Sequence, residues 1–224
     1  MKVLELFAGS RSFSKEAEKF GMKTHTTDFK DFEGIDQVCD IFDFDYDKVG
    51  FVPDIIWASP PCTFFSVASI GKHWNKDHTP KTMEAEWGLR IIRKMKEIIA
   101  HYTDINHNVY YIIENPRGKL RKVEEMRIYN LTLNTVWYCQ YGDTRAKPTD
   151  IWTNVNWIPR QVCHNGNKNC HHEPAPRGSR TGTQGVKGSY LRSIVPSELC
   201  KEILNSINSQ KSTQFYDGET DRIL

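Results

Sequence analysis

Short apolar runs alternate with amphipathic stretches over residues 2–153, and this alternation limits the fold more than any other feature of the chain. A repeated pattern of this kind is typical of a parallel sheet with helices on both faces. The expected strands cover residues 3–7, 23–27, 54–58, 109–113, 135–139 and 151–153. The sequence therefore predicts an α/β fold.

Two helices have clear signals. Residues 14–20 follow the first strand and stop at Gly21, as expected for a left-handed C-cap. In residues 83–102, apolar side chains recur every three or four positions, which places them on one face that we expect to pack in the core. These side chains are Met83, Trp87, Ile91, Met95, Ile98, Ile99 and Tyr102.

The chain has 224 residues, enough for one well-buried core with a small insertion. We expect a cofactor-binding catalytic domain over 1–153 and a small irregular inserted subdomain over 154–190. A helix that Pro196 opens is expected within 191–208 and returns to the catalytic domain. Residues 209–224 are expected to form a polar, frayed tail.

Charge and composition exclude several classes of protein. Lys and Arg number 30 against 28 Asp and Glu, so the net charge of +2 argues against a general polyanion binder. Glu5 interrupts the first apolar run, which does not resemble a signal peptide, and no run is long enough to span a bilayer. We expect a soluble, cytoplasmic protein that acts as a monomer, in a bacterial or phage-infected cell. Its six cysteines are expected to be free thiols or metal ligands.

Residues 151–197 differ in character from the rest of the chain. Glycines accumulate there, and six bases face a single acid, Glu173, which gives a local charge of +5. The bases are Arg160, Lys168, Arg177, Arg180, Lys187 and Arg192. A basic, glycine-rich segment is suited to contacts with a phosphate backbone. The alternative is a solvated loop that happens to be basic.

The first strand leads through a glycine turn into a helix, the arrangement from which open α/β sheets build nucleotide pockets. The turn consists of Phe7, Ala8, Gly9, Ser10, Arg11 and Ser12. Asp28 ends the second strand, where an acid would accept hydrogen bonds from ribose hydroxyls, unless it only caps a turn. Asp40, followed by Ile41, is placed to cover a base. Because no phosphate-binding loop is present, the pattern favours an adenosine without a phosphate chain, which S-adenosylmethionine provides.

Two expected strands end in residues suited to catalysis. Cys62 follows the strand 54–58 on a turn stiffened by Pro60 and Pro61, and Glu114 follows the strand 109–113. The proline turn cannot continue a strand, so it presents the cysteine sulfur to a bound substrate. A nucleophile and an acid at two strand ends indicate an enzyme.

At this point the chain resembles a known family, the cytosine-C5 DNA methyltransferases. The resemblance covers most of the chain, and its short motifs stand in the order of that family. They are Phe7-Ala8-Gly9, the acids Asp28 and Asp40, Pro60-Pro61-Cys62 with Phe65-Ser66, Glu114-Asn115, Tyr141-Gly142 ahead of Arg145 and Lys147, and Ser193-Ile194-Val195-Pro196.

The resemblance implies a Rossmann-like class I fold dependent on S-adenosylmethionine, with a flipped cytosine in DNA as substrate. It makes Cys62 the nucleophile that adds to C6 and Glu114 the acid at N3, with Asn115 shaping the pocket. Arg145 and Lys147 would orient the base or stabilise the carboxylate. By the same resemblance, Pro60 and Ser193 belong to the cofactor pocket.

The resemblance also implies a nucleic-acid surface. Residues 63–79 match a mobile loop that closes over DNA, in which His73 and His78 are expected to be loop residues and not catalysts. The expected DNA contacts are Ser66, Ser69, Lys72, Arg177, Arg180 and Lys187. The recognition segment, residues 154–190, is short, so few base contacts and a relaxed target sequence are expected.

The same segment contains a candidate metal site. Cys163, Cys170, His171 and His172 within it are candidate ligands of a structural zinc ion.

Three residues depart from the family pattern. Arg11 stands where another glycine is usual, and would either pair with the cofactor carboxylate or obstruct it. Thr63 replaces a glutamine, and Arg192 an asparagine. Three alternatives therefore stay open: the same chemistry on RNA of the transfer-RNA type, a catalytically idle DNA-binding protein, and a modifier of free nucleotides.

Overall fold

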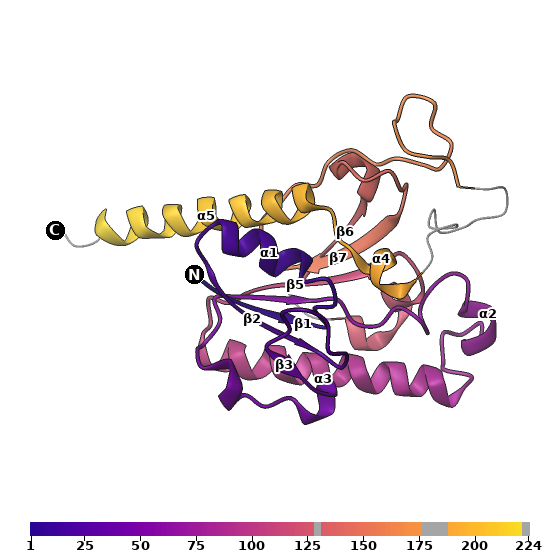
Figure 1. The fold of residues 1–224 in the computed structure, drawn as a ribbon, viewed down its shortest axis with the longest axis horizontal. Coiled ribbons are helices and arrows are strands. Elements are labelled where there is room, and N and C mark those ends of the chain that lie inside the picture. Colours follow the sequence, from indigo (N-terminus) through magenta and orange to yellow (C-terminus); the bar gives the residue numbers. More distant parts are fainter. Residues whose placement is uncertain (128–130, 176–187, 221–224) are drawn as a thin grey trace.

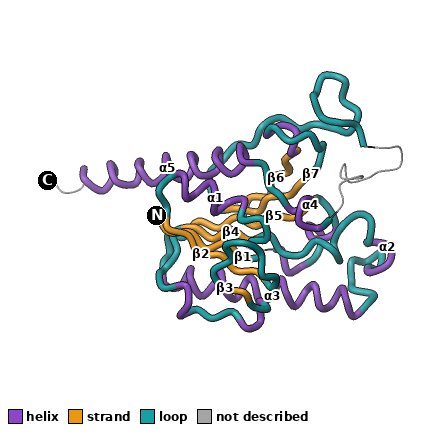
Figure 2. Tube along the Cα trace, viewed as in Figure 1, coloured by secondary structure: helices purple, strands orange, loops and turns teal. Residues whose placement is uncertain are grey.

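The computed structural model describes residues 1–127, 131–175 and 188–220. Its described strands form one sheet in the order β3-β2-β1-β4-β5-β7-β6. Figure 2 shows the strands as a single central layer with helices on either side. The strands are β1 Lys2–Leu6, β2 Lys23–Asp28, β3 Gln37–Val38, β4 Ile55–Ala58, β5 Tyr110–Pro116, β6 Thr132–Trp137 and β7 Pro148–Thr153. This arrangement confirms the Rossmann-like α/β fold.

The sheet is parallel, as the alternation predicts, except at one edge. The strands from β3 to β5 are parallel, whereas β7 is antiparallel to both β5 and β6. Only residues 138–147 join β6 to β7, and a parallel crossover needs a dozen or more residues. The short connection therefore forces the chain to reverse.

Helices cover both faces of the sheet (Figure 1). The α-helices of the described residues are α1 Ser12–Lys19, α2 Ile70–His73, α3 Met83–Ile105, α4 Ser189–Ser193 and α5 Ser197–Thr220. Helix α3 lies on one face, and α1 and α5 lie together on the other. No helix in the described part of the chain is long and apolar enough to cross a membrane.

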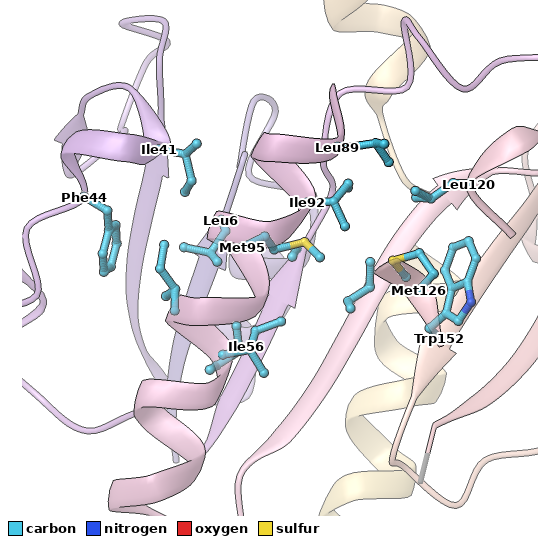
Figure 3. Packing of buried hydrophobic residues seen from close by; sticks show 14 of the residues in the cluster. Leu6, Ile41, Phe44, Ile56, Leu89, Ile92, Met95, Leu120, Met126 and Trp152 are labelled. Carbon is cyan, nitrogen blue, oxygen red and sulfur yellow. The ribbon is translucent and has the colours of Figure 1, made fainter. Parts of the chain in front are cut away.

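Alternating side chains of the strands supply two separate cores. Leu6 and Ile56 point to the α3 face and pack against Ile92 and Met95 (Figure 3). Trp57, from the next position of β4, joins the core beneath α1 and α5. The alternation that predicted strands thus becomes two packed layers, one on each side of the sheet.

Helix α3 forms as predicted, but its buried face is displaced at the N-terminal end. Met83 is 89% exposed and Trp87 is 41% exposed, although both were expected in the core. Trp87 instead packs against Phe42, with the rings tilted by 51° at a centroid separation of 5.0 Å, and the Arg90 guanidinium lies over the Trp87 ring. The core face of this turn is formed by Ala85, Gly88, Leu89 and Ile92.

The prediction of a frayed tail from residue 209 is also wrong, because α5 continues to Thr220 (Figure 1). Its second half extends past the rest of the described chain. Lys211 forms an ion pair of 3.2 Å with Asp54, and Gln210 exchanges hydrogen bonds with the backbone of Asn156. These contacts, and a sequence without a proline, carry the helix beyond Ile207, the last buried apolar residue among the helix positions whose burial is described.

Candidate active site

The turn that carries Cys62 is tied to the neighbouring strand end. Strand β4 ends at Ala58, which lies opposite Ile113 of β5, so Glu114 is the next residue on the adjacent strand. The Asn115 side-chain amide donates a hydrogen bond of 2.8 Å to the Pro60 carbonyl. Asn115 is fully buried and thereby fixes the proline turn against β5. The structure thus brings Cys62, Glu114 and Asn115 together, as predicted.

Glu114 is a buried carboxylate with one polar partner, a hydroxyl, and one cationic partner, an ammonium group. It is 5% exposed, and its Oε1 accepts a hydrogen bond of 2.8 Å from the Tyr138 hydroxyl. The Lys147 ammonium lies 3.7 Å from the same oxygen. A buried charge of this kind needs such partners to offset its loss of hydration. With Oε1 engaged, Oε2 is the oxygen left for another group.

The Cys62 thiol is half-buried beside these charges. Desolvation raises the pKa of Cys62, the positive charge of Lys147 lowers it, and the negative charge of Glu114 raises it further. The thiol form therefore predominates at neutral pH in the free protein, and Lys147 is the main group that favours the thiolate.

Lys147 and Arg145 connect this pocket to the segment before α5. Lys147 donates a hydrogen bond of 3.2 Å to the Arg192 carbonyl. Arg145 pairs with Asp143 and donates to the carbonyls of Leu191 and Ile194, at 3.2 and 3.1 Å. Lys147 thus lies beside the Glu114 carboxylate, whereas the Arg145 guanidinium binds the backbone before α5.

The predicted cofactor turn is shaped by Gly9 and Asp28. Gly9 has a φ of +49°, a conformation that side chains with a Cβ rarely adopt, and its N–H donates to Asp28 Oδ2 at 3.0 Å. Asp28 Oδ1 accepts from the Lys30 N–H at 2.9 Å, and burial raises the pKa of this carboxyl. Ser193 lies beside the turn, because a Cβ on Gly9 would come 3.6 Å from its Oγ.

Of the remaining residues predicted to bind the cofactor, some lie in the turn and others are used in capping or in the core. Ala8 is paired with Thr27, and Ser12 Oγ accepts from the Val195 N–H at 3.1 Å and lies 2.6 Å from the Ser10 hydroxyl. Asp40 caps the 3-10 helix Ile41–Asp43 by accepting from the Phe42 N–H. Ile41 is buried in the α3 core, and Pro60 is buried at the strand end.

Arg11 does not point toward the cofactor turn. Its φ of +54° starts α1 in the left-handed region, and Phe7 also has a positive φ, of 56°. The Arg11 guanidinium pairs with Glu18 and packs so closely on Gly34 that a Cβ there would come 2.9 Å from Arg11 Nη1.

A hollow of about 600 Å³ lies on the α1 side of the turn, lined in part by Ser10, Ser12, Lys15, Tyr190 and Ile194. Neither Asp28 nor Cys62 lines it. The hollow thus includes Ser10 and Ser12 of the predicted cofactor turn but not the acid at the end of β2. Pockets of open α/β sheets lie at the carboxyl ends of the strands.

The loop 63–79 packs closely on the body. Ser66 and Ser69 hydroxyls are 3.1 Å apart, and Ser69 donates to the Thr63 carbonyl. The Trp74 indole N–H donates to the Phe64 carbonyl at 2.7 Å, while Lys72 on α2 is exposed. The two histidines of the loop hold it in place, as His73 lies 2.8 Å from the Thr82 hydroxyl and His78 2.8 Å from the Lys119 ammonium.

Other predicted DNA contacts, namely Arg177, Arg180 and Lys187, lie outside the described residues. Of the predicted zinc ligands, Cys163, Cys170 and His172 lie together, and Cys139 completes the group. His171 is not part of it, because its Nε2 lies 3.1 Å from the Asp143 carbonyl oxygen.

Two residues of these sites were missed in the sequence. Tyr138 follows a strand and carries no motif that distinguishes it from a core tyrosine. Cys139 stands 24 positions before Cys163, too far for a recognisable ligand spacing. The available signal was the polar end of Tyr138, since a buried tyrosine hydroxyl usually finds a hydrogen-bond partner.

None of the known protein-family models matches the chain. The chain is 31% identical over 227 residues to the "Probable DNA (cytosine-5)-methyltransferase" of Frog virus 3 (isolate Goorha), covering 92% of this chain and 99% of that protein. A solved mutant of Spodoptera frugiperda DNMT2 aligns with a TM-score of 0.41 and 16% identity, over 73% of this chain and 57% of that one. The S. pombe Dnmt2 methyltransferase gives a TM-score of 0.42 and 17% identity, over 72% and 53% of the two chains.

The two structural alignments are too weak to decide more than the observed topology already does. The sequence relative is different, because its identity extends over nearly the whole of both chains. Together with the paired strand ends that carry Cys62 and Glu114, this relationship identifies the chain as a member of the cytosine-C5 methyltransferase family.

Proposed function

We propose that this protein methylates C5 of cytosine in DNA, with S-adenosylmethionine as methyl donor. The observation that carries the proposal is the position of Cys62 and the buried Glu114 at adjacent strand ends, with Lys147 beside the carboxylate. DNA is favoured over RNA because the relative from Frog virus 3 is named for DNA.

The glycine turn fits such a cofactor. Gly9 leaves the backbone open to close approach, and Asp28 is an acceptor at the end of β2, where ribose hydroxyls would bind. Ser193 closes the other side of the turn. Bound S-adenosylmethionine would supply an electrophilic methyl group.

In the proposed reaction the Cys62 thiol gives its proton to the Glu114 carboxylate, and the resulting thiolate forms a bond to C6 of cytosine. Glu114 gives a proton to N3, so the ring becomes an enamine whose C5 takes the methyl group. Loss of the C5 proton to water and cleavage of the sulfur–C6 bond restore the aromatic ring, and the N3 proton returns to Glu114. Lys147 stabilises both the thiolate and the carboxylate.

The cytosine must leave the helix for this reaction, because stacking in a duplex covers C6. We place the DNA over the loop 63–79, with Ser66, Ser69 and Lys72 at the backbone. The basic residues Arg177, Arg180 and Lys187 of the inserted segment are proposed to contact phosphates.

A trapping experiment tests the proposal. Duplex DNA and folded RNA, each with 5-fluorocytosine, are incubated with the protein and S-adenosylmethionine, and stable adducts are mapped by mass spectrometry. We expect an adduct between DNA and Cys62, because fluorine cannot leave C5 as a cation. An adduct with RNA alone would identify an RNA methyltransferase instead.

Two variants test the roles. Cys62→Ser should bind DNA without forming an adduct, and Glu114→Gln should be severely slowed. Cys200→Ala, a change at a buried cysteine in the core under α5 that has no role in the proposed reaction, serves as the control and should retain the adduct. If neither nucleic acid gives an adduct or incorporates labelled methyl, the protein is not an active methyltransferase.

A further inference from the structure

Three cysteines and one histidine meet beside the active site, although they come from two distant parts of the chain. Cys139 lies in the 3-10 helix Tyr138–Tyr141, and Cys163, Cys170 and His172 lie in the inserted segment. One ligand atom from each falls within 4.8 Å of all the others. A tetrahedral zinc ion with sulfur ligands about 2.3 Å away would separate neighbouring ligand atoms by about 3.8 Å, so small side-chain shifts suffice to close the site.

We propose that these four residues bind one structural Zn²⁺ ion. Thiolates and an imidazole in a set of four match the ligand preference of zinc, and a set completed by protein leaves no position for a substrate. Cys139, Cys163 and His172 are buried, and Cys170 is half-buried, so the site is closed to solvent on most sides.

Amide donors already surround the sulfurs as they do in a metal–thiolate site. Asn167 Nδ2 lies 3.5 Å from the Cys163 sulfur. Gln140 Nε2 lies 3.7 Å from the Cys170 sulfur and 3.9 Å from that of Cys139. Such donors stabilise negative charge on the ligands and fix their orientation.

His172, and not its neighbour His171, is oriented as a ligand. Its Nδ1 lies 3.8 Å from the Cys163 sulfur, whereas its Nε2 lies 3.2 Å from the Gly166 N–H. Nδ1 is therefore the nitrogen that faces the sulfurs. Metal binding through Nδ1 moves the ring proton to Nε2, which requires the Gly166 amide to turn away.

Among the described residues, the inserted segment is held near its start by Arg160, which pairs with Glu198 and Glu202 of α5, whereas the part around the cysteines has only a small apolar cluster. Few apolar side chains accompany the cysteines in their cluster, chiefly Ala146 and Trp137. The segment does contact the connection between β6 and β7, because the Glu173 N–H donates to the Thr144 carbonyl at 2.9 Å and the backbone of Glu173 forms an isolated β-bridge with that of Arg145. Cys139 directly follows Tyr138, the donor to Glu114. A zinc ion would thus attach the inserted segment to the 3-10 helix that carries Tyr138.

The test measures metal content and does not depend on methyl transfer. The full-length chain is prepared under reducing conditions with zinc, freed of loose metal, and analysed by mass spectrometry. We expect about one zinc per chain. Reconstitution with Co²⁺ should give the intense thiolate-to-cobalt absorption of a tetrahedral site, which reports on the ligands in the wild-type fold.

Ligand variants have a matched control in the adjacent histidine. Cys163→Ser and His172→Ala should lose most of the metal, whereas His171→Ala should keep it. A wild-type chain with less than about one tenth of a zinc per protein, and no cobalt–thiolate band, would overturn the proposal. Loss of metal in His171→Ala with retention in His172→Ala would overturn the ligand assignment. A disulfide between two of the four cysteines, seen as a loss of two thiols on titration, would also refute it.

Discussion

Replacing Tyr138 by phenylalanine should slow methyl transfer without weakening cofactor binding. The Tyr138 hydroxyl donates to Glu114 Oε1 at 2.8 Å in a fully buried position. The change removes one oxygen atom and leaves the ring in place. Tyr138 is therefore expected to act as a positioning residue, which holds the carboxylate so that its other oxygen faces the base.

The size of the effect follows from the hydrogen bond that is lost. A buried hydrogen bond to a charged group contributes about 1.5 to 3 kcal/mol. Lys147 remains 3.7 Å from the same oxygen and retains part of the interaction. The low end of the range therefore applies, and about 1.4 kcal/mol corresponds to a tenfold loss of kcat. The KM for S-adenosylmethionine should stay unchanged, since Tyr138 does not contact the Gly9 turn.

Tyr141→Phe provides a matched control. Tyr141 lies on the same 3-10 helix, is equally buried, and accepts a hydrogen bond of 2.9 Å from the Arg160 N–H. Methyl transfer to DNA is measured for both variants under saturating cofactor, and folding is checked by circular dichroism. Equal losses of kcat in the two variants, or a wild-type kcat in Tyr138→Phe, would refute the positioning role.

Three other changes test the charges and packing around the site. Lys147→Gln removes the charge that lowers the pKa of Cys62, so alkylation of Cys62 by iodoacetamide should require a higher pH, as a rate–pH profile would show. Burial raises the pKa of Glu5 from 4.5 to about 7, so the free energy of unfolding should fall as pH rises from 4.5 to 7, by at most about 3 kcal/mol. Glu5→Gln should flatten that dependence in urea titrations at several pH values, and an unchanged slope would contradict the assignment. Gly118→Ala would place a Cβ 2.3 Å from the Phe65 carbonyl oxygen, so urea unfolding should show a loss on the order of 2 kcal/mol, and wild-type stability would show that the loop can move at no cost.

The proposed nucleophile and the proposed acid could be located from the sequence because each follows an apolar run. Cys62 and Glu114 come directly after segments that only a strand explains, and adjacent parallel strands end at one edge of a sheet. Tyr138 could not be located in this way. Its partner Glu114 stands 24 positions earlier and belongs to β5, which β7 separates from β6. Only the completed sheet brings these two residues together.

The helix α3 shows a different limit. A periodic stripe predicts a helix whatever lies around it, but the buried sector depends on what packs there. Trp87 belongs to the predicted stripe, yet it lies against Phe42 at the rim of the core. The first turn of α3 projects beyond the sheet, so Met83 has no neighbouring layer to bury it. The amphipathic spacing thus predicts that a helix forms here, but it does not determine which side chains of the first turn are buried.

The antiparallel direction of β7 brings Lys147 to the end of the sheet where Glu114 lies. Lys147 directly precedes β7, so in a sheet with β7 also parallel it would lie at the edge opposite Cys62. A strand of six residues spans about 20 Å, which would remove Lys147 from Glu114 altogether. Because β7 runs antiparallel, its first residues, the end of β6 and the end of β5 share one edge. Tyr138 and Lys147 therefore reach the same oxygen of Glu114 from the two ends of one short connection. That connection also carries Cys139. The same short segment therefore supplies both partners of Glu114 and one of the four proposed zinc ligands.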